Sequence, residues 1–75
     1  MIVYVVIESC QETRTPSEMN VNTFGSIEDV KRHLSFEIEE YGFVISDNRE
    51  RQIFDENVNN NFGGEILILM EDVEL

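Results

Sequence analysis

The chain has 75 residues and a formal net charge of -11 at pH 7, from sixteen acidic and five basic side chains. Charge of this density argues against direct binding to nucleic acid or to an anionic membrane surface, because both would repel the protein. It also exceeds what solubility requires, and this predicts a basic partner.

The composition predicts one folded domain spanning residues 1–75. Hydrophobic residues make up 41% of the chain, including five Phe and two Tyr, which is enough for a core in a domain near the lower size limit for independent folding. The lone Cys10 cannot form an internal disulfide, and no leader-like segment opens the chain, so we expect a reducing cytoplasm. No apolar run approaches the roughly 20 residues of a membrane helix, so we expect no membrane association.

A run of β-branched and aromatic residues, Ile2 to Ile7, opens the sequence. Residues of this kind at every position predict a central strand that is apolar on both faces. Residues 8–23 are polar and carry the only proline, Pro16. They predict an irregular connection, in which Met19 to Phe24 are compatible with a short second strand.

The next segment predicts a helix that starts at Ser26 and ends before Gly42. Ser26 can cap the first turn, with Asp29 in the capping-box position. Gly42 falls where a left-handed C-terminal cap is expected. Between them, apolar residues recur at spacings of three and four, which is typical of a helix with one buried face. This apolar stripe consists of Ile27, Val30, Leu34, Ile38 and Tyr41.

Two strands at residues 43–46 and 52–55, joined by the polar loop 47–51, are predicted to form a hairpin. The Asn- and Gly-rich stretch 57–64 predicts a turn. The last strand follows from Glu65 to Met70 and can extend to Leu75. The sequence therefore predicts an α+β fold, with one helix packed on a mostly antiparallel sheet of four to five strands in the order β(β)αβββ.

A single helix covers only one face of such a sheet, whereas Ile2 to Ile7 and Ile66 to Met70 are apolar on both. The second face must be covered by the connection 8–23, by another copy of the chain, or by a partner. We favour a homodimer, because small domains often need association to be stable. The connection as a cover remains the alternative.

The side chains that could support catalysis or metal binding do not form a recognisable set. His33 is the only histidine and lies at the boundary of the helical stripe, and together with Cys10 it cannot supply the usual zinc ligands. The stretch from Asp55 matches early ligand positions of an EF-hand calcium loop, but Asn60 replaces the glycine and Ile66 replaces the bidentate glutamate. We expect a protein that is not an enzyme and holds no metal or cofactor.

Acidic residues crowd the second half of the chain, including three in the last turn of the predicted helix. A helix C-terminus disfavours negative charge, so this placement indicates a functional pressure, with a solvated acidic face as the alternative. Phe36 falls opposite the apolar stripe and predicts an exposed aromatic contact, unless a loop or a second subunit covers it. The predicted partner-binding residues are Phe36, Glu37, Glu39, Glu40, Asp47, Glu50, Asp55, Glu56, Glu71, Asp72 and Glu74.

In size, acidity, expected dimerisation and lack of catalytic residues, the whole chain resembles the small DNA-mimic proteins that bacteriophages make, most of all the inhibitors of the nucleoid protein HU. It is similar in style to the small acidic anti-CRISPR proteins. The resemblance rests on charge and not on a diagnostic motif. It implies a dimer in the host bacterial cytoplasm whose carboxylates replace DNA phosphates on a basic HU-like protein, with Phe36 adding an apolar contact.

A second hypothesis makes the chain a non-catalytic structural or adaptor subunit, which binds a protein through the apolar second face of its sheet. In that case the acids serve solubility. The two hypotheses differ in salt dependence, because an ionic contact weakens as salt rises and an apolar contact does not.

Overall fold

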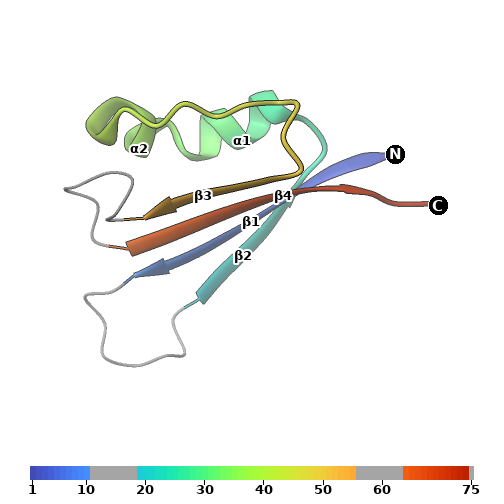
Figure 1. The fold of residues 1–75 in the computed structure, drawn as a ribbon, viewed down its shortest axis with the longest axis horizontal. Coiled ribbons are helices and arrows are strands. Elements are labelled where there is room, and N and C mark those ends of the chain that lie inside the picture. Colours follow the sequence, from blue (N-terminus) through green and yellow to red (C-terminus); the bar gives the residue numbers. More distant parts are fainter. Residues whose placement is uncertain (11–18, 56–63, 75) are drawn as a thin grey trace.

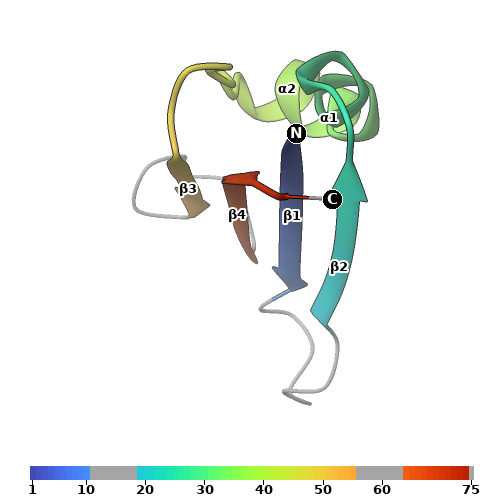
Figure 2. The ribbon, with the colours of Figure 1, turned by 90° about the vertical axis from the view of Figure 1, so that its right-hand side faces the viewer.

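A computed structural model describes residues 1–10, 19–55 and 64–74 of the chain. These residues form an antiparallel four-stranded sheet with two short helices on one face (Figures 1 and 2), so the predicted α+β class is confirmed. The strands lie in the order β2-β1-β4-β3. The elements are β1 (Ile2–Cys10), β2 (Met19–Phe24), α1 (Ile27–His33), α2 (Ser35–Tyr41), β3 (Arg51–Asp55) and β4 (Gly64–Asp72).

Strand β1 lies between β2 and β4, which confirms the prediction that the opening apolar run is a central strand. It pairs with β4 along all nine of its residues. Tyr4 and Val6 are buried beneath the helices, while Val3, Val5 and Ile7 alternate with them on the other face and are half-buried. The strand is therefore apolar on both faces, as its composition indicates.

The connection predicted for residues 8–23 is shorter than expected. Residues 8–10 extend β1, and Met19–Phe24 form the short second strand, paired antiparallel with β1. The polar side chains of this segment are tolerated because no residue of β2 is fully buried. The described part of the predicted connection therefore belongs to the sheet and does not cover its second face. Residues 11–18, with Pro16, lie outside the described residues.

Both predicted helix caps are present. The backbone N–H of Asp29 donates to Ser26 Oγ at 3.2 Å, which supplies a partner for one free amide of the first turn. Gly42 ends the second helix in the left-handed conformation, with φ 69°, where a residue with a side chain would be strained.

The single helix predicted between these caps is wrong, because the structure divides it into α1 and α2 at Leu34. Leu34 has φ -99° and ψ 21°, although its N–H still bonds to the Val30 carbonyl at 2.9 Å. The break coincides with an attachment to the sheet. His33 Nε2 lies 2.8 Å from Glu8 Oε2, and the His33 ring packs 5.0 Å from the ring of Phe24. No Gly or Pro marks this point, so the spacing of apolar residues reads as continuous.

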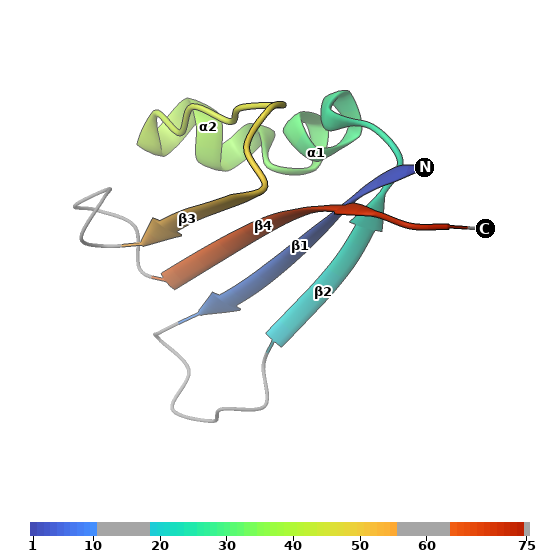
Figure 3. The same ribbon diagram turned by 45° about the vertical axis from the view of Figure 1, so that its right-hand side comes forward.

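The predicted strand at residues 43–46 is also wrong. This segment runs back alongside the helices toward the start of β3 (Figures 1 and 3) and pairs with no described strand. Strand β3 pairs antiparallel with β4 instead. Phe43 and Ile45 are nonetheless buried, and the Phe43 ring stacks on Phe54 of β3 at 4.5 Å. Because α2 has no fully buried residue, these two side chains complete the core above β3.

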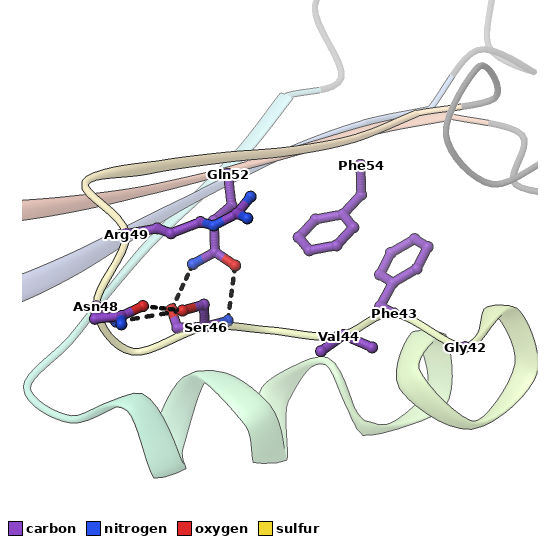
Figure 4. A pocket seen from close by; sticks show the side chains of 8 residues that line it. All are labelled: Gly42, Phe43, Val44, Ser46, Asn48, Arg49, Gln52 and Phe54. Atoms are coloured by element: carbon purple, nitrogen blue, oxygen red, sulfur yellow. Dashed lines mark hydrogen bonds between the residues drawn. The ribbon is translucent and has the colours of Figure 1, made fainter.

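A buried side chain replaces the missing strand partner. Gln52 of β3 accepts a hydrogen bond from the Ser46 N–H at 2.8 Å and donates one to the Ser46 carbonyl at 2.6 Å (Figure 4). The side chains of segment 43–46 alternate between buried and exposed without the segment belonging to the sheet, which is why its sequence resembles a strand. The fully buried centre of the core comprises Val6, Val30, Leu34, Ile66 and Ile68.

Candidate partner-binding site

The antiparallel sheet brings together acidic residues that are distant in sequence. The turn before β3 lies against the final part of β4, where the Met70 N–H donates to the Glu50 carbonyl at 2.9 Å. The turn therefore lies next to the C-terminal segment, and the acidic residues of both segments are exposed. We call this set the terminal acidic group; it comprises Asp47, Glu50, Glu71, Asp72 and Glu74.

The N-terminus lies at the same end of the molecule and holds the C-terminal segment in place (Figure 1). The Met1 ammonium donates to Asp72 Oδ1 and to the Val73 carbonyl, each at 3.1 Å, and the Val73 N–H donates to the Met1 carbonyl at 2.8 Å. Asp72 is therefore partly balanced by a positive charge. The remaining four members of the group have no ion pair with a described residue.

The first turn of α1 adds acids that the sequence did not single out. In Figures 1 and 3 this turn lies at the same end as the two termini, and it carries Glu28 and Asp29. Asp29 pairs with Arg32 at 3.2 Å, while Glu28 is exposed. Negative charge is common in the first turn of a helix because it interacts favourably with the helix dipole, so these two acids carried no sign of a second role.

Among the described residues, the other predicted acids lie on α2 and at the end of β3, at the opposite end of the molecule (Figure 1). Because the helix breaks at Leu34, Glu37 falls in the first turn of α2, a favourable position, and only Glu39 and Glu40 remain in the last turn. Asp55 lies directly opposite Glu65 in the β3–β4 pairing. The predicted residues thus divide between two ends of the molecule, and Glu56 lies outside the described residues.

Phe36 faces outward, as its position opposite the apolar stripe predicts. The residue is 62% exposed, and its ring lies in an edge-to-face arrangement with the Tyr41 ring, at 6.4 Å between centroids. It lies on α2, the helix that carries Glu37, Glu39 and Glu40, and not beside the terminal acidic group.

The sheet face opposite the helices has an apolar centre and is uncovered by any described element (Figure 2). Three side chains on its outer strands are strongly exposed: Val21 at 59%, Met19 at 58% and Ile53 at 41%. We call this surface the open sheet face. Its half-buried centre is formed by Val3, Val5, Ile7, Leu67 and Leu69.

Within the described ranges, no three His, Cys, Asp or Glu side chains are grouped so that they could hold a metal ion. None of the helices described is long and apolar enough to cross a membrane. No family model matches the chain, and neither a curated protein nor a solved structure was found to be similar to it. Function must therefore be inferred from the geometry and charge of the molecule itself.

Proposed function

We propose that the protein is a non-catalytic DNA mimic, which binds the nucleic-acid-binding surface of a basic protein and excludes DNA from it. A bacterial nucleoid protein of the HU type is the favoured target. The observation that supports this proposal is the terminal acidic group, in which two neighbouring segments that are distant in sequence both carry exposed acidic residues. Such carboxylates can accept from Lys and Arg the charge-assisted hydrogen bonds that phosphates accept in DNA.

The proposal includes a homodimer formed through the open sheet face. Burial of exposed residues such as Val21 and Ile53 would give the small domain additional stability. The terminal acidic groups of both copies would then be present on one particle, so that one dimer could contact an extended basic surface.

A competition experiment tests this function. Purified HU is bound to a fluorescein-labelled DNA duplex, and the protein is added as wild type or as one of two variants. The test variant carries Glu50→Gln, Glu71→Gln and Glu74→Gln; the matched control carries Glu37→Gln, Glu39→Gln and Glu40→Gln on α2. Both lose the same charge in the same residue type, and neither changes Asp72, which bonds to the N-terminus.

We expect the wild type to displace DNA from HU. The test variant should require a concentration at least about tenfold higher for the same displacement. The control should stay within about threefold of the wild type, because its acids lie at the other end. Equal loss in both variants would show that total charge matters and the terminal acidic group does not. Failure of the wild type to displace DNA from HU and from other basic DNA-binding proteins would overturn the function.

The open sheet face favours a second candidate, an adaptor subunit that binds a protein through this surface. A monomeric protein with this much exposed apolar surface on one face has a binding surface available. If the chain is monomeric at micromolar concentration and fails to displace DNA, the adaptor becomes the better hypothesis. If it dimerises through the open sheet face, that surface is occupied and the adaptor is excluded.

A further inference from the structure

A groove runs beside the free edge of β3. Strand β3 is the last strand of the sheet, so its outer edge pairs with no other strand. Two adjoining hollows share Val44, Arg49, Gln52 and Phe54 in their walls and together form this groove; Figure 4 shows the residues that line one of them. Its apolar part includes the stacked rings of Phe43 and Phe54, with Val44 at the rim, 83% exposed.

The edge of β3 offers unpaired backbone groups to this groove. The hydrogen bond from the Met70 N–H to the Glu50 carbonyl fixes the alternation of the β3–β4 pairing, in which Arg51 lies opposite Leu69. In an antiparallel pair every second residue turns its N–H and C=O away from the neighbouring strand. Arg51 and Ile53 therefore direct these groups outward, and no hydrogen bond to a described residue engages them.

The groove differs in charge from the rest of the molecule. Both Arg49 and Arg51 contribute to its walls, and no acidic side chain among the described residues does, although the chain carries a net charge of -11. Neither arginine forms an ion pair with a described residue, whereas Arg32 pairs with Asp29. Two guanidinium groups without carboxylate partners beside a hollow indicate an anionic ligand.

We propose that this groove binds an extended acidic segment of a partner protein, which adds to the free edge of β3 as a fifth strand. Backbone hydrogen bonds to Arg51 and Ile53 would align the segment, and its carboxylates would pair with the two arginines. Its side chains on the groove side, if apolar, would contact Val44 and the aromatic wall of the groove.

A simpler explanation of the arginines is that charged residues on a short edge strand prevent unwanted pairing with other sheets. That role requires neither the hollow nor its aromatic wall, and both are present. The net charge of the protein opposes the approach of an acid from a distance, but screening at physiological salt limits this repulsion to about 8 Å. Short-range contacts in the groove therefore decide the binding.

The experiment uses a short fluorescein-labelled peptide of alternating glutamate and valine, measured by fluorescence anisotropy at physiological salt. One control peptide replaces glutamate with lysine. A second keeps the sequence but carries N-methyl groups on alternate backbone amides, so that it retains the charge and loses strand pairing. The test variant is Arg49→Gln with Arg51→Gln; the matched variant, Lys31→Gln with Arg32→Gln, removes the same charge from exposed positions of α1.

We expect the acidic peptide to bind the wild type saturably. Its affinity for the test variant should be at least about tenfold lower, and so should the affinity of the N-methylated peptide for the wild type. The matched variant should stay within about threefold of the wild type. The proposal is overturned if the lysine peptide binds as well as the acidic one, if N-methylation has no effect, or if both variants lose binding equally. These outcomes are read from peptide binding alone and do not depend on HU displacement, although Arg49 and Arg51 flank Glu50 of the terminal acidic group.

Discussion

Gln52 holds Ser46 through both backbone groups of that residue, accepting from its N–H at 2.8 Å and donating to its carbonyl at 2.6 Å. A side-chain amide thereby replaces the strand neighbour that an extended segment ordinarily needs. Gln52 is the only buried polar side chain of the described core. It fastens the segment 43–46 over β3 and thereby holds Phe43 and Ile45 in the core.

Replacing Gln52 with leucine should therefore destabilise the protein although the new side chain is apolar. The Ser46 N–H and carbonyl would lose their partners, and we expect the free energy of unfolding to fall by about 1–3 kcal/mol. Urea denaturation followed by circular dichroism measures this change. Asn48→Ala is the control, because Asn48 bonds to the Ser46 hydroxyl at an exposed position. An equal effect of both substitutions on the free energy of unfolding would mean that the two Gln52 hydrogen bonds stabilise the protein no more than the exposed Asn48 hydrogen bond.

Two glycines provide a matched test of the helix end. A methyl group added at Gly42 or at Gly25 would meet no atom within 4 Å, but only Gly42 has a positive φ, 69°. Gly42→Ala should lower the free energy of unfolding by about 1–2 kcal/mol, because a side chain strains the left-handed backbone. Gly25→Ala should be neutral or slightly stabilising, since it restricts the unfolded chain. Identical melting temperatures for the two variants would contradict the left-handed cap.

Phe36 and Phe43 should respond oppositely to truncation, because they are 62% and 3% exposed. Phe43→Ala should cost about 3–5 kcal/mol, comparable with the whole stability of a small domain. Phe36→Ala should change stability by about 0.5 kcal/mol or less. Thermal melts at several protein concentrations measure both. A large, concentration-dependent loss for Phe36→Ala would place this side chain in an interface between copies.

The proposed dimer should strengthen as salt rises, in contrast to the proposed complex with a basic protein. Each copy carries a net charge of -11, so screening between about 0.05 M and about 0.5 M salt reduces repulsion between copies while it weakens ionic binding. Sedimentation equilibrium measures the dimer across this range. A chain that stays monomeric throughout has no dimer of the kind proposed.

A pair of valine substitutions locates the dimer interface. Val21 belongs to the open sheet face, whereas Val44 is exposed outside it. Val21→Lys should weaken the dimer by about tenfold or more, because a charge would be buried at the interface, and Val44→Lys should leave it unchanged. If Val44→Lys alone disrupts the dimer, the copies associate through the edge of β3.

The sequence was sufficient where local rules agree with the fold. The apolar run in β1, the cap by Ser26 and the left-handed Gly42 each depend on residues close together in the chain, and all three are present. The alternation of Phe43, Val44 and Ile45 also follows a local rule, but a strand needs a partner. The side chain of Gln52 filled that place, and no sequence pattern indicates such a substitution.

The positions of the charged residues were harder to predict from the sequence, because they depend on how the strands pair. That Glu50 lies beside the end of β4 follows from the β3–β4 register, which the predicted hairpin of 43–46 with 52–55 would not have produced. The division of the acids between two ends has the same origin. Arg49 and Arg51, spaced by one residue in an acidic chain, were the available sign of the groove, and their meaning required the knowledge that β3 is an edge strand.

The pairing of β1 with β4 at the centre of the sheet has a consequence for synthesis on the ribosome. The edge of β1 that faces β4 cannot form its hydrogen bonds until β4 has emerged from the exit tunnel. Until then, this edge of a hydrophobic strand remains unpaired in the nascent chain. Contacts between such distant segments slow the search for the native state. We therefore expect the sheet to form after translation of β4, and nascent chains that stop before it to depend on chaperones or to be degraded.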